Sequence, residues 1–341
     1  MLSFENDYSA AACPQIIARM QQIQNETHPG YGTDDYCKAA AGKIRALCDN
    51  PESDIWFLTG GTQTNQVAID SITAQYAGVV CADSAHINTH EAGAIEATGH
   101  KVLALPQQDG KISAPQLDDY CERFNADANH THMVRPGCVY VSQPTEYGTV
   151  YTRAELAALA QVAHDHGMPL FIDGARLGYA LTCDANDANL DDLARIADVF
   201  TIGGTKVGAM FGEAVVFTRG NTPENFTALV KLHGALLAKG WLLGLQFDTL
   251  FTDDLYFQLS KHANSQADKI RQALLDKGYD IAFVSQTNQI FITVTHSRAQ
   301  ELQQQVKLGF MEAVDASHVM LRICTSWATT DDQVAALIAL L

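Results

Sequence analysis

The sequence contains few basic residues. Only 22 of its 341 residues are Lys or Arg, against 39 Asp or Glu, and the formal net charge is -17. Nucleic acids and anionic membrane surfaces bind proteins through basic patches. The charge therefore argues against either one as a partner, and any basic residue held in an apolar stretch calls for a specific explanation.

Paired cysteines and long apolar runs are also missing. The eight cysteines are scattered, and no two of them have the C-x-x-C spacing. In a chain of this size, that pattern indicates reduced, mostly buried thiols rather than a disulfide framework or a zinc site. No uninterrupted apolar run approaches the roughly 18 residues of a membrane span. Residues 1–7 lack the basic start and apolar core of a signal peptide, so we expect a cytoplasmic protein.

The apolar residues that are present, 47% of the chain, suffice for a packed core. A chain of 341 residues is long for one domain, and a large domain with a smaller one is the natural division. We expect a large domain over residues 1–246, including the N-terminal segment and a long helix over residues 226–247 that bridges two lobes. Residues 247–341 then form a small α+β domain.

A lysine follows a Gly-Gly turn in the most informative stretch. Residues 198–202 are typical of a short buried strand, and Gly203-Gly204 then force a tight turn. Lys206 would lie at the mouth of a sheet, where desolvation lowers its pKa and makes the amine a nucleophile toward an aldehyde. The alternative is an ordinary surface lysine on a loop.

A second glycine pair precedes a helix. Residues 55–58 are typical of a buried strand, and Thr59-Gly-Gly-Thr62 leads into a helix that carries Thr62 and Thr64 near its start. Free N–H groups and the helix dipole favour a phosphate at such a position. The stretch matches neither the Walker loop nor G-x-G-x-x-G. A capped helix that binds nothing is the alternative.

Two histidines stand four residues apart, at His86 and His90, with Glu91 next to them. On a helix this trio could share a metal ion, but the order is not H-E-x-x-H and no further ligand is evident. We therefore favour either a His86 ring that stacks on a flat ligand or a hydrogen-bonded core histidine. We expect no metal site.

Charged residues also follow or interrupt the predicted strands. Asp173 ends a central parallel strand, where open α/β sheets place ligand groups, and Arg176 can face the same crevice, although the two could form a structural ion pair. Glu146 follows another strand and is either an acid or base in a cleft or a solvated loop carboxylate. Arg322 lies in an apolar strand and is costly to bury unless it meets an anion. Tyr31, between two glycines, is most simply a turn residue.

Together these features match the needs of pyridoxal 5'-phosphate. The cofactor requires a lysine for its aldehyde, a carboxylate that keeps its pyridine nitrogen protonated, and a helix terminus for its phosphate. An aromatic side chain stacks on the ring. Lys206, Asp173, the Gly60-Gly61 turn and His86 are the candidates.

The chain resembles the low-specificity L-threonine aldolases, a family of the β-eliminating lyase group. The resemblance runs from Phe4 to Trp327, and its most specific blocks lie at residues 85–93, 172–176 and 203–206. It implies an α/β fold of the aspartate-aminotransferase type (fold type I), with a large, mostly parallel sheet and a small C-terminal α+β domain. It also implies a cytoplasmic homotetramer, or a dimer, with sites shared between subunits.

The same resemblance implies roles for residues around the cofactor. Lys206 would carry the cofactor, His86 would stack on its ring, and Asp173 would meet its pyridine nitrogen. Arg176 would lie beside the cofactor, while Gly61 and Thr62 would hold its phosphate.

Substrate contacts are implied as well. Arg322 would bind the substrate carboxylate, and Tyr31 could act across a subunit interface. The chain departs from the family at Asn6, where many members have serine, and at Trp241, where an arginine often helps to bind the carboxylate. If Trp241 lines the site, it weakens that binding; alternatively it packs in the bridging helix. Glu146 matches one branch of the family, where another branch has histidine.

The implied activity is a lyase reaction of amino acid metabolism. L-threonine, L-allo-threonine or a related β-hydroxy-α-amino acid would be cleaved to glycine and an aldehyde, with His86 or Glu146 as the base at the β-hydroxyl. The alternatives are a β-eliminating or aminotransferase-like enzyme that uses the same cofactor, or a protein that binds it without turnover.

Overall fold

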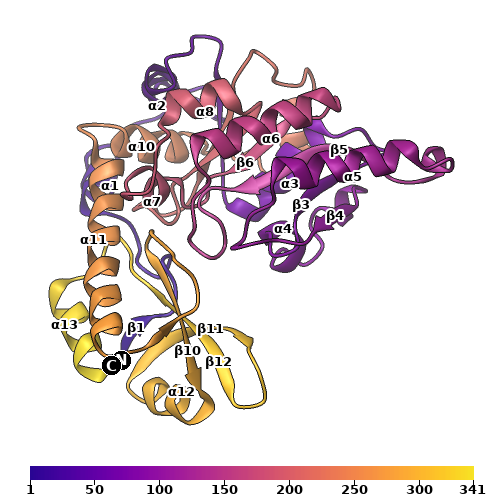
Figure 1. The fold of residues 1–341 in the computed structure, drawn as a ribbon. Helices are drawn as coiled ribbons and strands as arrows, with labels where there is room; N and C mark the ends of the chain where they lie inside the picture. The colour runs from indigo at the N-terminus through magenta and orange to yellow at the C-terminus, as the bar shows by residue number, and fades with distance from the viewer.

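The computed structural model describes all residues from 1 to 341 and shows a larger and a smaller lobe, each built on one sheet (Figure 1). The larger sheet has seven strands, of which β4, β3, β5, β6 and β7 are parallel to one another, while β8 is antiparallel to both β7 and β2. In spatial order they are β2 (Asp54–Leu58), β8 (Glu213–Phe217), β7 (Val199–Gly203), β6 (Leu170–Asp173), β5 (Arg135–Ser142), β3 (Ala77–Ala82) and β4 (Val102–Leu105). The expected α/β fold with a mostly parallel sheet is confirmed.

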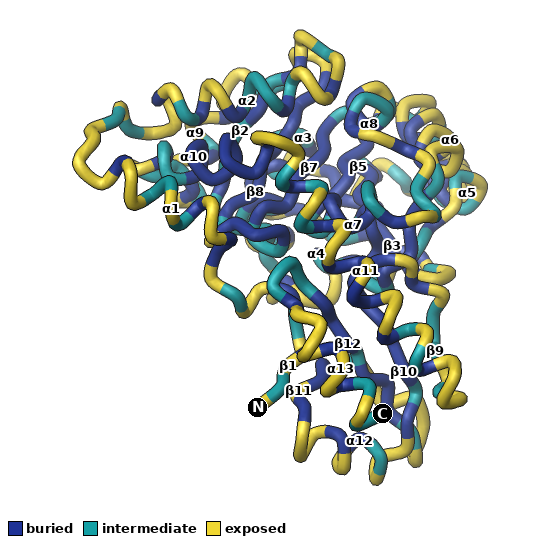
Figure 2. Tube along the Cα trace, turned by 90° about the vertical axis from the view of Figure 1, so that its left-hand side faces the viewer, coloured by how far each residue is buried: buried dark blue, intermediate teal, exposed yellow.

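Helices cover this sheet, as the buried strands require. Every residue of β3, β6, β7 and β8 is buried, which is typical of a sheet covered on both faces. The helices of the larger lobe are α1 (Pro14–Gln22), α2 (Asp35–Leu47), α3 (Gly61–Ile72), α4 (His86–Thr89), α5 (Ala114–Ala126), α6 (Arg153–Asp165), α7 (Leu177–Leu181), α8 (Leu190–Ile196), α9 (Phe226–Leu232) and α10 (Trp241–Leu250), with short 3-10 turns at Glu96–Thr98 and His130–His132. Figure 2 shows the buried strands running through the middle of this lobe.

The expected single helix over residues 226–247 is wrong. Two helices, α9 and α10, occupy this stretch, and Gly234 between them has a φ of 69°, which glycine adopts without the strain a side chain would add. The connection between the lobes is instead α11 (Leu255–Asp276), which runs from one lobe to the other (Figure 1). Its first half contributes Tyr256 to the larger core, and its second half contributes Ile270 to the smaller one.

The smaller lobe combines a five-stranded sheet with α12 (His296–Gln303) and α13 (Asp331–Leu340). In spatial order the strands are β1 (Leu2–Phe4), β11 (Val306–Ala313), β12 (His318–Cys324), β10 (Gln289–Thr295) and β9 (Asp280–Ile281). β1 pairs parallel to β11, and Phe4 belongs to the small core, so residues 2–4 lie in the smaller sheet rather than in the larger domain to which we assigned them. The division at residue 246 stays a prediction.

The helices agree with the absence of a long apolar run in the sequence. None of them is both long and apolar enough to cross a membrane.

The packing of α2 on α10 depends on a glycine. A Cβ atom at Gly244 would overlap the backbone nitrogen and the Sγ atom of Cys37, whereas a Cβ at Gly42, in the interior of α2, would meet nothing within 4 Å. The two positions form a matched pair.

We therefore expect Gly244→Ala to destabilise the protein by about 1–3 kcal/mol, because the helices must separate. Gly42→Ala, the control, should stabilise it by about 0.5–1 kcal/mol, because alanine restricts the unfolded chain and favours a helix. Thermal or urea unfolding of both variants measures the difference. Equal stabilities would contradict the close packing of α2 on α10.

Candidate active site

A polar cavity lies at the carboxyl ends of β5, β6 and β7, against the start of α3. Only one of the twelve residues around it is hydrophobic. The lining residues are Gly61, Asn65, His86, Glu91, Ser142, Pro144, Thr145, Glu146, Asp173, Ala175, Arg176 and Lys206. Parallel strands end at the same edge of a sheet, so segments that lie far apart in the sequence meet there. The cavity includes each strand-end residue that the sequence singled out.

Lys206 follows β7 and the Gly203-Gly204 turn, as expected. Its side chain is half-buried, and its amine forms no ion pair within the chain. Burial, followed by the nearby Arg176 guanidinium, lowers the pKa of the Lys206 amine, while the carboxylates around it act in the opposite direction. A lysine with a lowered pKa and a free amine is a competent nucleophile.

Asp173 ends β6 with a buried carboxylate. Its Oδ2 accepts hydrogen bonds from the Tyr140 hydroxyl at 2.6 Å and from Asn65 Nδ2 at 2.8 Å, and its Oδ1 accepts one from the Ala175 backbone at 2.8 Å. Sequence reasoning missed Tyr140 and Asn65. Asn65 could have been found, because it lies one helical turn after Gly61 and therefore on the same face of α3.

His86 is held by a carboxylate. Its Nδ1 lies 2.7 Å from Glu91 Oε1, and Asn65 Nδ2 donates to the same oxygen at 2.8 Å. With Nδ1–H donating to the carboxylate, the neutral ring keeps its Nε2 lone pair free. Asn65 thus bridges the carboxylates of Glu91 and Asp173. The His90 ring stacks on His86 with 5.7 Å between centroids.

Glu146 also reaches the cavity. Its Oε1 accepts hydrogen bonds from the Ser142 hydroxyl at 2.6 Å and from the His86 backbone N–H at 2.9 Å. Burial raises the pKa of Glu146 above its ordinary value, while the hydrogen bond from Ser142 opposes that change. The alternative of a solvated loop carboxylate is excluded.

The start of α3 offers free backbone donors. Gly60 is the N-cap residue, no side chain caps the helix, and a Cβ at Gly60 or Gly61 would meet nothing within 4 Å. Gly61 lines the cavity, and Thr62, the next residue of the helix, is exposed. The uncapped N–H groups of this helix can bind an anion such as a phosphate.

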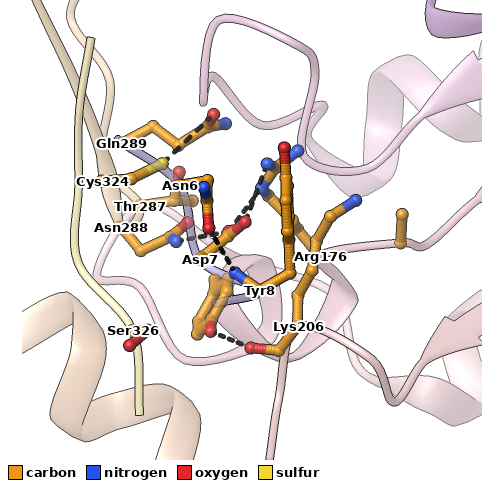
Figure 3. Close-up of polar contacts among 12 residues, drawn as sticks. Asn6, Asp7, Tyr8, Arg176, Lys206, Thr287, Asn288, Gln289, Cys324 and Ser326 are labelled. Carbon is orange, nitrogen blue, oxygen red and sulfur yellow. Dashed lines mark hydrogen bonds and ion pairs between the residues drawn. The ribbon is translucent and has the colours of Figure 1, made fainter. Parts of the chain in front are cut away.

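Arg176 lines the cavity but forms its ion pair with Asp7, not with Asp173. Its Nε lies 2.7 Å from Asp7 Oδ2 (Figure 3). The alternative that Asp173 and Arg176 form a structural ion pair, which we did not favour, is therefore excluded. Asp7, from the segment after β1, is a residue that sequence reasoning missed.

Tyr31 and Asn6, which we expected at the site, lie outside this cavity, and so does Trp241, for which two positions were open. Tyr31 lines a separate, mainly apolar hollow with Trp56 and Leu243, and the Lys231 amine lies 5.2 Å from its ring. Trp241 packs against the His28 ring in a tilted arrangement with 4.9 Å between centroids, so within this chain it packs at the start of α10 instead of lining the site. The side chain of Asn6 accepts hydrogen bonds from Tyr8 and Ser9.

Arg322 lies near the cavity without lining it. Its Nη1 donates to Gln289 Oε1 at 3.2 Å, and its Nη2 donates to the Glu5 carbonyl at 3.1 Å. The charge of Arg322 also acts on His90. Burial, then His86 and then Arg322 lower the pKa of that histidine. The residue is half-buried and each Nη carries a second N–H, so the guanidinium can still receive a carboxylate.

Several known proteins resemble this chain in sequence or in structure. The sequence model described as "Beta-eliminating lyase" matches residues 4–297. A low specificity L-threonine aldolase of a Pseudomonas species is 28% identical over 98% of this chain and 96% of its own length. A solved structure of Leishmania major threonine aldolase is 39% identical, with a TM-score of 0.96 over 100% of this chain and 98% of that one.

One more distant structure shares only the fold. An aspartate aminotransferase from Thermus thermophilus is 15% identical, with a TM-score of 0.73 over 100% of this chain and 90% of that one. The expected aspartate-aminotransferase fold is thereby confirmed.

Glu213 adds a buried acid next to Lys206. It begins β8, its Oε1 accepts a hydrogen bond from Thr205 at 2.8 Å, and its Oε2 is buried without a partner. Burial raises the pKa of Glu213 to about 8, although Lys206 opposes this change. At a pH between 4.5, the ordinary value of the group, and about 8, the folded protein therefore holds a proton that the unfolded chain releases.

From this we expect stability to decrease as the pH rises from about 5 to about 8, because the unfolded state binds fewer protons at this residue. Glu213→Gln removes the carboxyl and should flatten that part of the stability curve. Thermal midpoints measured across this pH range test the effect, with Glu224→Gln, at an exposed glutamate, as the control. Parallel curves for wild type and Glu213→Gln would show that Glu213 ionises normally.

Proposed function

The chain belongs to the beta-eliminating lyase family, and we propose that it is a threonine aldolase-type carbon–carbon lyase. Its substrates would be L-threonine, L-allo-threonine or related β-hydroxy-α-amino acids, and its products glycine and an aldehyde. The observation that carries the proposal is the convergence of a free lysine amine, a buried carboxylate and an uncapped helix start on one polar cavity. The named threonine aldolases among its relatives support it.

The donors around the cavity fit pyridoxal 5'-phosphate. Lys206 would hold its aldehyde carbon, and Asp173, with lone pairs not used by its three donors, would meet the pyridine nitrogen. The uncapped start of α3 at Gly61 and Thr62 would hold the phosphate. When bound, the cofactor supplies an electron-accepting ring.

His86 and Arg176 would complete the cofactor site. The Glu91 carboxylate fixes the orientation of the His86 ring, so that its face can lie against a planar group. Arg176 lines the same cavity, and its pairing with Asp7 holds the guanidinium in place.

The chain's own residues can then act on the substrate. Glu146 and His86 are the two candidate bases at the β-hydroxyl. The raised pKa of Glu146 brings the carboxyl nearer to neutral pH, where a general base works best, and His86 has a free Nε2. Arg322 would receive the substrate carboxylate in a charge-assisted pair. Asn6 would be a further substrate contact only if it released Tyr8 and Ser9.

Assembly and location belong to the same proposal. We expect a cytoplasmic homotetramer or homodimer. Tyr31 is more than half exposed and lies outside the cavity of its own chain, so it could reach a substrate only in the site of a partner subunit. Neither a nucleic acid nor a membrane is expected as a partner.

The rival functions differ in their products. β-Elimination would release a keto acid and ammonia, and transamination would convert the cofactor to its amine form. A protein without turnover would bind the cofactor and change no amino acid. Ring chemistry alone permits all of these outcomes.

We expect borohydride reduction of the protein loaded with pyridoxal phosphate to place the adduct on Lys206. The reason is that Lys206 is the lysine that lines the cavity. Peptide mass spectrometry identifies the modified residue. Lys231→Arg, which changes a lysine outside the cavity, should leave the labelling intact. An adduct on another lysine, or no uptake at all, would end the proposal.

Incubation with L-threonine or L-allo-threonine should yield glycine and acetaldehyde in equal amounts. 2-Oxobutanoate with ammonia as the main products would instead assign the protein to β-elimination, and a 2-keto acid without ammonia would assign it to transamination. Chromatography of the products with an aldehyde assay distinguishes these outcomes.

Glu146→Gln should lower kcat by about 100- to 10,000-fold if Glu146 is the base, because a glutamine cannot accept the hydroxyl proton. The visible absorption of the bound cofactor should persist, which separates loss of the base from loss of the site. Ser142→Ala is the matched control, since it removes one hydrogen bond to Glu146 and keeps the carboxylate. Unchanged kcat in Glu146→Gln would assign the proton transfer to His86.

A further inference from the structure

Asp7 is a buried carboxylate at the point where three segments of the chain meet. It follows β1 and is only 1% exposed. Figure 3 shows it between Asn288, from the smaller lobe, and Arg176, from the turn after β6, with Lys206 beside that arginine. A buried charge is costly unless it is paired and hydrogen-bonded, so its partners explain why it is tolerated.

The contact between Asp7 and Arg176 uses two parallel hydrogen bonds. Arg176 Nε donates to Asp7 Oδ2 at 2.7 Å, and Arg176 Nη2 donates to Asp7 Oδ1 at 3.0 Å. The side chain of Asp7 is fully buried and that of Arg176 is 13% exposed. Such a bidentate pair fixes the plane of the guanidinium as well as its position.

A third hydrogen bond ties this pair to the smaller lobe. Asn288 Nδ2 donates to Asp7 Oδ2 at 2.8 Å and to the Thr325 carbonyl at 2.8 Å. Asn288 stands directly before β10, and Thr325 directly after β12. The orientation of Arg176 in the cavity therefore depends on a residue that is anchored in the other lobe.

Several charges converge on Lys206. The groups that influence its amine are Arg176, Asp7, Glu213, Asp173 and Cys324. Tyr179 of α7 lies in the same neighbourhood. Burial raises the pKa of its hydroxyl, Asp7 raises it further, and Arg176 opposes this change. Arg176 favours the neutral form of the Lys206 nitrogen, whereas Asp7 favours the protonated form. Asp7 thus offsets the arginine that it orients.

We propose that Asp7 is a positioning residue of the site, which fixes the Arg176 guanidinium and supplies the negative charge that balances it next to Lys206. This role rests on the proposed cofactor site. Asp7 itself does not line the cavity, so it acts through its neighbours and does not touch the substrate.

The test is a pH titration of the visible absorption of protein loaded with pyridoxal phosphate, which reports protonation at the Lys206 nitrogen. Asp7→Asn should lower the midpoint by about one pH unit, a tenfold change in the proton equilibrium, because the protonated nitrogen loses a nearby negative charge. Arg176→Gln should raise the midpoint. The double variant should return it close to that of the wild type.

Two further variants separate the charge from the packing. Asp7→Glu keeps the charge and should hold the midpoint close to the wild-type value. Asn288→Ala removes a hydrogen bond without removing a charge, so it should lower the thermal midpoint and leave the titration within about 0.3 pH units of the wild type. A purely structural Asp7 would lower thermal stability in these variants without moving the titration.

Asp7→Asn leaves a buried arginine unpaired, and the single variant could fail to fold. In that event Asp7→Asn in the Arg176→Gln background must still lower the midpoint relative to Arg176→Gln alone. An unchanged or raised midpoint in the folded variants overturns the role of Asp7 and leaves the proposed function intact. A wild-type protein that takes up no pyridoxal phosphate overturns both.

Discussion

The site depends on the hydrogen bonds made to the buried Asp173 carboxylate. Asn65 donates to it and to Glu91, and Glu91 in turn orients the ring of His86. Tyr140 donates to the same oxygen of Asp173, Oδ2, and the Ser142 hydroxyl that supports Glu146 lies 3.4 Å from the Tyr140 oxygen. A buried carboxylate is costly unless donors satisfy its oxygens. The network therefore satisfies the Asp173 carboxylate and also positions both candidate bases.

Charge balance is the second constraint on the cavity. The chain carries few basic residues, yet two of them, Lys206 and Arg176, line one small polar cavity. Asp7 pairs with the arginine through two hydrogen bonds, while Glu213 and Asp173 only partly oppose the lowering of the Lys206 pKa by burial and by Arg176. Because Glu213 is buried with one oxygen unpartnered, its pKa is raised to about 8 and part of that balance depends on pH.

The fold alone does not select the reaction. The aspartate aminotransferase of similar architecture shows that the same arrangement of sheets serves a protein named for another chemistry. In this chain the cavity brings together Glu146 and the His86–Glu91 pair, which are the groups on which the proposed reaction rests. The smaller lobe reaches the cavity only indirectly, because Asn288 donates a hydrogen bond to Asp7, and Asp7 pairs with the cavity residue Arg176.

Local pattern by itself determined the strands, the Gly-Gly turns and the polar residues at strand ends. Backbone sterics and burial act over a few residues, so Lys206, Asp173 and Gly61 could be placed at one edge of a parallel sheet from the sequence alone. Only the tertiary structure decided which partners they meet. The pairing of Arg176 with Asp7 and the packing of Trp241 against His28 depend on contacts between distant segments. A sequence pattern carries no information on the direction in which a side chain finds a partner 169 residues away, because that direction is set by how the lobes pack.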